Sequence, residues 1–211
     1  MPTEQRTRAR SSRERVLKAA TALFAARGFH ETSTRDVARK ARVNEVTVFR
    51  LFKNKRELYL QVLDGKLGLT VPEWLRPTLQ SSDDYDKVFL SLAERLEEFF
   101  DPVLLRLLFY AALESPELLR KCYRPRLVSF YEILGRHIQE QINNGILKNM
   151  DPILMGRALV GIVVYHQIVC QLLGGCDFPG NVQGSAKAYT DIWLHGALAQ
   201  TTPAGLEPVD V

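Results

Sequence analysis

The chain has 211 residues, of which 46% are hydrophobic and 25% charged, a composition that predicts a folded soluble protein and excludes a disordered chain. Its net charge of +4 is unevenly distributed, because residues 1–66 hold 16 basic and 7 acidic residues (+9) and the remainder holds 12 and 17 (−5). Only the first third of the chain therefore has a charge suited to a polyanionic partner.

The first predicted helix follows a basic segment. Ser11-x-x-Glu14 is a capping box, and apolar residues keep helical spacing from there as far as Phe24. Gly28 predicts the end of this helix, since glycine adopts the left-handed conformation without steric cost. The preceding segment is either a solvated charge run or an arm that enters a minor groove. The basic residues that would form this arm are Arg6, Arg8, Arg10 and Arg13.

Two short helices are predicted next, separated by only three residues. A second capping box, Ser33-x-x-Asp36, opens one helix, and Asn44 caps the other. This spacing is typical of a helix-turn-helix. Arg42 stands where such turns usually have glycine, and a positive φ there would cost about 1 kcal/mol. The predicted buried positions are Val37, Ala38, Ala41, Val48, Leu51 and Phe52.

The rest of the chain also keeps helical periodicity, and no segment has the alternation of a β-strand. We therefore predict an all-α protein. Breaks are expected at Pro72 and Pro77, and a bend or interruption is expected near Pro125. The predicted helix starts are Ser81-x-x-Asp84, Asp101-Pro102, Ser115-Pro116, Asp151-Pro152 and Gly184-Ser185, the last helix extending through Gln200.

The segment RVLKAATALFAARGFHETSTRDVARKARVNEVTVFRLFKNKREL resembles the DNA-binding head of the tetracycline-repressor (TetR) family, over about residues 13–60. The resemblance implies a three-helix head followed by a variable helical body that binds an effector and forms a homodimer. We accordingly divide the chain into a basic N-terminal arm (1–12), a helix-turn-helix DNA-binding domain (13–60) and an effector-binding and dimerisation domain (61–211).

The resemblance also implies roles for individual residues of the head. Thr34 and Arg35 would contact phosphates, Arg35 alternatively a base, and Lys55 would hold a phosphate. The residues of the recognition helix that would face the groove are Glu45, Val46, Thr47, Phe49 and Arg50. An arginine such as Arg50 can donate two hydrogen bonds to guanine, a contact worth about 1 to 3 kcal/mol of discrimination. The alternative for Arg50 is an ordinary solvated side chain.

The body contains one helix that is apolar on nearly every face, at about residues 152–173. Arg157, His166, Gln167 and Gln171 interrupt it, which argues against a membrane span. Together with the helix at about 185–200, it predicts a four-helix seam between two subunits. Two heads on such a dimer would favour an inverted-repeat operator in double-stranded DNA.

The body also has enough aromatic residues to line a cavity for a small apolar or aromatic effector. Each of them is also compatible with an ordinary place in the core. The residues proposed for the cavity are Phe99, Tyr110, Glu114, Tyr131 and His166. Phe100, Phe109, Tyr123, Phe130 and Tyr165 are further aromatic candidates.

No chemical motif points to an enzyme, a cofactor or a metal. The three cysteines, Cys122, Cys170 and Cys176, have neither metal-ligand spacing nor the pattern of a disulfide framework, which indicates a reducing cytoplasm. We expect a ligand-responsive transcriptional regulator, a repressor released from its operator by the effector. The alternatives are an all-α carrier or enzyme with an incidental basic head, and a nonspecific nucleoid-type DNA binder.

Overall fold

The computed structural model describes residues 2–68, 73–174 and 185–198, with side chains from Ser11 onward. These ranges are helical, apart from turns and one isolated bridge between Leu147 and Leu198. The helices are α1 (Pro2–Arg27), α2 (Thr34–Ala41), α3 (Glu45–Phe52), α4 (Lys55–Leu67), α5 (Leu75–Leu79), α6 (Tyr85–Phe99), α7 (Pro102–Glu114), α8 (Pro116–Asn143), α9 (Pro152–Leu172) and α10 (Ser185–Ala197). The prediction of an all-α protein is confirmed.

Most of the predicted helix starts are confirmed, because a side chain caps the free amides of the first turn. Ser33 accepts a hydrogen bond from the third amide of α2 at 3.0 Å, and Asn44 accepts one from the second amide of α3 at 2.9 Å. Asp101 and Asp151 cap α7 and α9 in the same way, each followed by proline at the first helical position. Proline fits there because its missing amide hydrogen would have no partner inside the helix.

Several predicted boundaries differ from the structure. Helix α1 begins at Pro2 and runs through Ser11, since the arginine, glutamate and glutamine residues before Ser11 are good helix formers. Helix α6 begins after Asp84, which is itself the capping residue, so Ser81 is not. Pro77 lies within the first turn of α5, where no intrahelical amide is needed, and α8 continues through Pro125. Pro72 lies outside the described residues, as do residues 199 and 200 of the last predicted helix.

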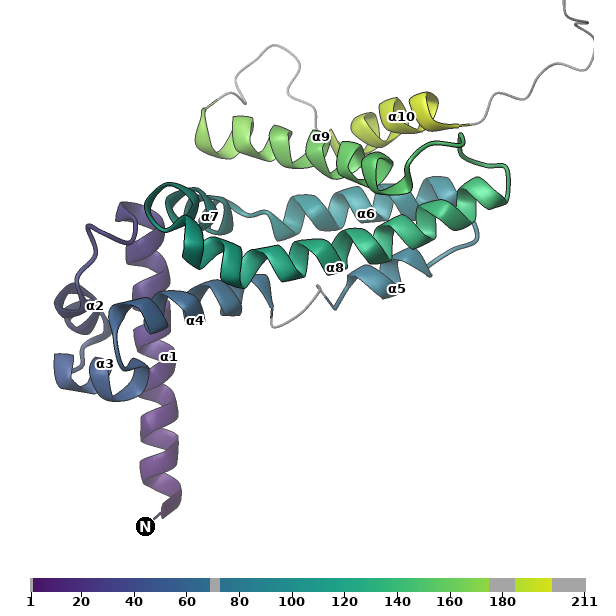
Figure 1. Ribbon diagram of the computed structural model, residues 1–211. Helices are drawn as coiled ribbons and strands as arrows, with labels where there is room; N and C mark the ends of the chain where they lie inside the picture. The colour runs from purple at the N-terminus through teal and green to yellow at the C-terminus, as the bar shows by residue number, and fades with distance from the viewer. Residues whose placement is uncertain (1, 69–72, 175–184, 199–211) are drawn as a thin grey trace, which may run out of the picture.

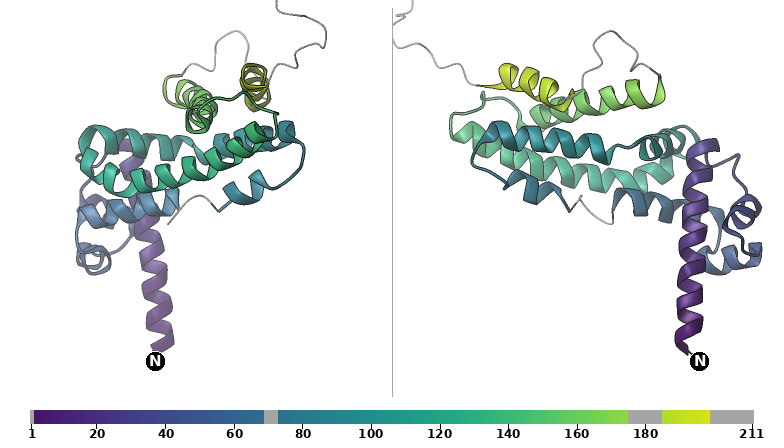
Figure 2. Two further views of the ribbon diagram at one scale, coloured as in Figure 1. Left: turned by 45° about the vertical axis from the view of Figure 1, so that its right-hand side comes forward. Right: turned by 180° about the vertical axis from the view of Figure 1, so that it is seen from behind.

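The helices form an N-terminal head and an elongated body (Figure 1). Helices α1 to α3 make the head, and α1 extends beyond it as a single rod, which Figure 2 also shows from behind. Helix α4 leads from the head along one side of the body and crosses the predicted domain boundary at residue 60. Helix α8 spans the body lengthwise, while α9 and α10 cover the side away from α5.

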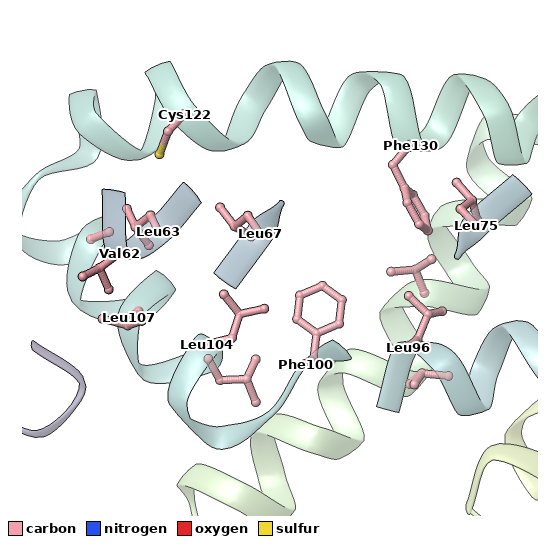
Figure 3. Packing of buried hydrophobic residues seen from close by; sticks show 14 of the residues in the cluster. Val62, Leu63, Leu67, Leu75, Leu96, Phe100, Leu104, Leu107, Cys122 and Phe130 are labelled. Carbon is pink, nitrogen blue, oxygen red and sulfur yellow. The ribbon is translucent and has the colours of Figure 1, made fainter. Parts of the chain in front are cut away.

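A continuous hydrophobic core joins the head to the body. Tyr59 and Leu63 of α4 are fully buried, and α4 packs against α7. Figure 3 shows Leu63 together with Leu104 and Leu107 of α7, which are buried as well. The hydroxyl of Tyr59 donates a hydrogen bond to the carbonyl of Leu107 at 2.9 Å. Helix α7 is therefore linked directly to α4, the helix that leads out of the head.

Helix α9 has two different faces. By length and composition alone it could cross a membrane. One face, with Met155, Leu159 and Val163, is buried against α6, α8 and α10. The opposite face leaves Leu154 and Tyr165 exposed. The apolar character of this helix is thus only partly explained by packing within one copy of the chain.

Candidate nucleic-acid interface and ligand cavity

The turn between α2 and α3 is held by an arginine in a left-handed conformation. Arg42 has φ 54° and ψ 50°, as the sequence predicted, and its amide donates to the carbonyl of Arg39 at 3.2 Å. The next amide, that of Val43, donates to Ala38 at 3.0 Å. An L-residue in this conformation costs about 1 to 2 kcal/mol. The short turn between α2 and α3 therefore requires local backbone strain at Arg42.

A second strained residue joins α3 to α4. Lys53 has φ 61° and ψ −52°, and the amide of Asn54 donates to the carbonyl of Phe52 at 2.6 Å. This is a three-residue γ-turn, whose positive-φ form is rare and strained. Asn54 then caps α4 by accepting from the amide of Glu57 at 2.8 Å. The turn fixes the start of α4 relative to α3.

The outward face of α3 combines apolar and basic side chains. Val46 is 71% exposed and Phe49 is 46% exposed, although Val48 and Phe52 on the other face are buried. Arg50 lies exposed on the same helix. Val46 and Phe49 are three positions apart on one helix, so they form a small exposed apolar patch beside Arg50.

Thr34, the first residue of α2, is hydrogen-bonded to Glu45, the first residue of α3. The hydroxyl of Thr34 donates to the Glu45 carboxylate at 2.7 Å, while Arg35 is exposed beside them. A hydroxyl has one proton to donate, so a phosphate contact by Thr34 would come from its backbone amide. That amide and the amide of Arg35 are the first two of α2, and such amides have no partner inside a helix.

Lys55 is half-buried and already has partners inside the head. Its ammonium lies 3.4 Å from the carbonyl of His30 and 4.4 Å from the centre of the Phe29 ring. The remaining predicted groove residue, Thr47, is half-buried in the first turn of α3. The structure thus pairs Thr34 of α2 with Glu45 of α3 and leaves Arg35 and Arg50 exposed on the same two helices. The ammonium of Lys55 already contacts the loop after α1.

Arg13 does not belong to a separate arm. Its guanidinium stacks on the Phe52 ring, 4.9 Å from the ring centre, and hydrogen-bonds to Gln61. Because α1 is continuous through this region, Arg13 instead secures α1 against α3 and α4. The side chains of Arg6, Arg8 and Arg10 lie outside the described residues.

The head and body are joined by a carboxylate that the sequence assigned to the effector cavity. Glu114, at the end of α7, accepts hydrogen bonds from the amides of Phe29 at 2.7 Å and His30 at 3.0 Å. Gly28 has φ 80° and lies against Glu114 and Tyr110, so closely that an added Cβ would overlap both. Glu114 and Tyr110 therefore position the loop after α1.

The body contains an apolar cavity of about 300 Å³, at the lower end of the range for small-molecule sites. Figure 3 shows Leu67, Phe100 and Phe130 around this part of the interior. The lining residues are Leu67, Leu96, Phe99, Phe100, Leu105, Leu108, Phe109, Tyr123, Arg126, Leu127, Phe130, Tyr131, Val160, Gly161, Val164 and Ile168. They come from α4, α6, α7, α8 and α9 and the residue that follows α6.

Of the five residues predicted for this cavity, Phe99 and Tyr131 line it. Tyr110 and Glu114 lie outside it, because they point toward the head. His166 also lies outside it, because its ring packs against Tyr189 of α10, whose hydroxyl is 3.1 Å from the imidazole Nδ1. The exposed Tyr165 is likewise not a lining residue.

The lining residues with polar side-chain ends are Tyr123, Tyr131 and one residue that carries a guanidinium. Burial, together with the neighbouring Tyr131, raises the pKa of Tyr123 to about 12. Burial also raises the pKa of Tyr131. Both phenols are therefore neutral at physiological pH. The guanidinium belongs to Arg126, which the sequence did not single out because nothing in its neighbourhood shows that it faces the interior.

The sequence pattern argued against a disulfide framework, and the structure differs from that prediction at one cysteine. Cys122 is a free buried thiol, and burial raises its pKa, but Cys170 is disulfide-bonded. Spacing in sequence did not reveal this, since a disulfide depends on two Cβ atoms lying about 4 Å apart in the fold. Among the described residues, no three His, Cys, Asp or Glu side chains gather as a metal site would require.

A tight helix-turn-helix with a basic and apolar outward face, attached to a helical body with a cavity, is an arrangement typical of helix-turn-helix transcriptional regulators. The model of bacterial regulatory proteins of the tetR family matches residues 16–62. The head of this chain is therefore similar to the N-terminal domain of that family.

Two curated relatives are similar to the head. The uncharacterized HTH-type transcriptional regulator YvkB of Bacillus subtilis is 45% identical over 49 residues. An HTH-type transcriptional repressor of Mycobacterium tuberculosis is 51% identical over 49 residues. Each match covers 23% of this chain and 26% of the relative, so the chain spans about a quarter of the length of the relatives it matches.

Two solved structures resemble the whole fold. A protein of Mesorhizobium loti described as a TetR-family transcriptional regulator has 22% identity and a TM-score of 0.70 over 91% of this chain and 99% of its own. A protein of Saccharomonospora viridis described as a transcriptional regulator, in complex with choline, has 20% identity and a TM-score of 0.70 over 89% and 98%. At these identities the likeness concerns the fold.

Proposed function

We propose that this protein is a cytoplasmic, ligand-responsive repressor that binds an inverted-repeat operator as a homodimer. The observation that carries the DNA-binding part is the outward face of α3, where Val46 and Phe49 are exposed beside Arg50. Apolar side chains at such positions contact thymine methyl groups, and arginine recognises guanine. The excess of nine positive charges in residues 1–66 supplies the attraction to phosphates.

Phosphate contacts would fix the head on the duplex. The two free amides at the start of α2 and the side chain of Arg35 point to one such contact. The ammonium of Lys55 retains donors beyond its bond to His30, so it serves a second contact at the start of α4. The carboxylate of Glu45, held by Thr34, would accept a hydrogen bond from cytosine N4.

The dimer is proposed on the exposed apolar face of α9 and α10. Tyr165 is 68% exposed and Ile192 is 63% exposed, and Leu154 is exposed on the same face of α9 as Tyr165. A second copy of the chain would cover these residues and form a four-helix seam. Two heads related by a twofold axis would then occupy two half-sites of an inverted repeat.

The test of DNA binding is selection of bound sequences from a random duplex pool at near-physiological salt. Recovery of one inverted repeat supports the proposal. Arg50→Ala is expected to weaken binding to that sequence by about 10- to 100-fold, corresponding to a lost guanine contact. The matched control is Arg136→Ala, which removes an exposed arginine from the body. No motif, with binding that disappears as salt rises, would instead indicate the nonspecific nucleoid-type binder.

The test of the dimer is molar mass in solution by light scattering. Tyr165→Glu and Ile192→Glu are expected to yield monomers, because each places a charge in the seam. Leu113→Glu, which changes an equally exposed apolar residue on α7, is expected to leave the dimer intact. A wild-type monomer at micromolar concentration would refute the proposed seam. The all-α carrier or enzyme remains the alternative if no DNA sequence is preferred.

A further inference from the structure

The cavity of the body has a single charged residue among its described lining residues. This residue is Arg126 of α8, whose side chain is only 15% exposed. The remaining lining is aliphatic or aromatic, apart from the hydroxyls of Tyr123 and Tyr131. A cation in such surroundings is costly unless acceptors surround it. The hydrogen bonds of Arg126 therefore indicate which charge a ligand of this cavity carries.

Three bonds hold Arg126: one reaches α4, one reaches the residue that follows α4, and one stays within α8. One terminal nitrogen, Nη2, lies 2.6 Å from the Asp64 carboxylate, and Nε donates to the carbonyl of Gly68 at 2.8 Å. The other terminal nitrogen, Nη1, donates to the carbonyl of Cys122, one turn earlier on α8. A guanidinium has five N–H groups, so these three bonds leave two for another acceptor.

We propose, building on the proposed regulatory function, that the cavity binds an amphipathic acid. Its apolar tail or ring lies among the aromatic side chains, and its carboxylate binds the guanidinium of Arg126 in competition with Asp64. The ligand thereby weakens the connection between α8 and α4.

Charge complementarity selects this class of ligand. A buried carboxylate needs a paired cation, and the planar fork of arginine matches its two oxygens. A neutral ligand without an acceptor leaves the two remaining N–H groups of Arg126 unpaired, which is costly in an apolar cavity. A quaternary ammonium could lie on the aromatic faces, but the positive charge of Arg126 in the same cavity opposes it.

The contact between Arg126 and Asp64 connects the cavity to the head through α4. Asp64 and Gly68 lie at the end of α4, and α4 begins beside the recognition helix. Leu67, between them, lines the cavity itself. Lys66 pairs with Asp101, the capping residue of α7, at 2.5 Å. Among the described residues, two ion pairs hold this end of α4 against the body, and an acid that displaces Asp64 from Arg126 removes one of them.

The test uses the full-length protein and three ten-carbon probes, each below the concentration at which it forms micelles: decanoate, 1-decanol and decyltrimethylammonium. Isothermal titration calorimetry is expected to show decanoate binding at least about 10-fold tighter than either of the others. Arg126→Met is expected to weaken decanoate binding about 10- to 100-fold and to change decanol binding by less than about 3-fold. Equal affinity for decanoate and decanol, or preference for the ammonium, overturns the proposal.

A second variant keeps the proposal testable if Arg126→Met fails to fold. Asp64→Asn leaves Arg126 in place and removes its competitor, so decanoate should bind several-fold tighter than to the wild type. Asp83→Asn, which removes an exposed carboxylate elsewhere, should have no effect. Unchanged or weaker binding to Asp64→Asn would overturn the competition with Asp64.

The two proposals fail separately. Binding of the probes is measured without DNA, so it does not depend on the protein being a regulator. A protein that binds its selected operator but none of the three probes overturns the ligand proposal and leaves the proposed function in place. A protein that binds decanoate through Arg126 but prefers no DNA sequence overturns the proposed function and leaves the ligand proposal in place.

Discussion

Replacement of Gly28 by alanine tests the junction between head and body. Gly28 has φ 80°, and a Cβ at this position would lie 2.4 Å from a carboxylate oxygen of Glu114 and 2.7 Å from the Tyr110 ring. Glu114 cannot move away freely, since its other oxygen accepts from the amides of Phe29 and His30. Gly28→Ala therefore combines backbone strain with the loss of a connection between α7 and the head.

The expected loss in the free energy of unfolding is about 2 to 4 kcal/mol. The left-handed conformation contributes about 1 to 2 kcal/mol for an L-residue. Weakening the two hydrogen bonds to the Glu114 carboxylate adds about 1 to 2 kcal/mol, at the lower end for a charged acceptor because water reaches part of this site. Gly145→Ala is the matched control, since Gly145 has φ 72° and nothing lies within 4 Å of its Cβ position. Only the backbone contribution applies there.

The measurement is urea unfolding of the three proteins at one fixed concentration, because a dimer's stability depends on concentration. Gly28→Ala should lose about 1 to 2 kcal/mol more than Gly145→Ala. In a double-mutant cycle, Gly28→Ala and Glu114→Ala should cost less together than the sum of the two. Equal losses at the two glycines, or strict additivity with Glu114→Ala, would refute the proposed contact.

Three further predictions concern local stability and pH. Arg42→Gly and Lys53→Gly should each raise the free energy of unfolding by about 0.5 to 1 kcal/mol, because relief of positive-φ strain exceeds the added entropy of the unfolded chain. The measurement is urea unfolding, and a variant less stable than the wild type would contradict the prediction. Ser33→Ala should lower the free energy by about 1 kcal/mol through loss of the α2 cap, measured the same way, and no change would contradict it. Burial lowers the pKa of His137 from its ordinary value of 6.5, so the unfolded state binds the proton more readily and stability falls as the pH drops below about 6.5. His137→Phe should reduce that fall, and an unchanged pH profile between 7 and 5 would contradict it.

The sequence was informative where structure depends on residues a few positions apart. The capping residues Ser33, Asn44, Asp101 and Asp151 act on amides two or three residues ahead, so their patterns predicted four helix starts. The left-handed conformation of Arg42 was expected because this residue stands where such turns usually have glycine. Family resemblance covered the same local region, from the first helix to the start of α4.

The tertiary structure decided what joins the head to the body and what the cavity contains. Asp64 and Arg126 are 62 positions apart, and Phe29 and Glu114 are 85 apart. Helical periodicity indicates that a residue lies on a face, but it does not say which distant helix covers that face. The sequence therefore placed Glu114 in the cavity and overlooked Arg126, since both assignments depend on how α4, α7 and α8 pack. Local rules determined most helix starts and the helix-turn-helix head, while long-range packing determined the cavity and its connection to that head.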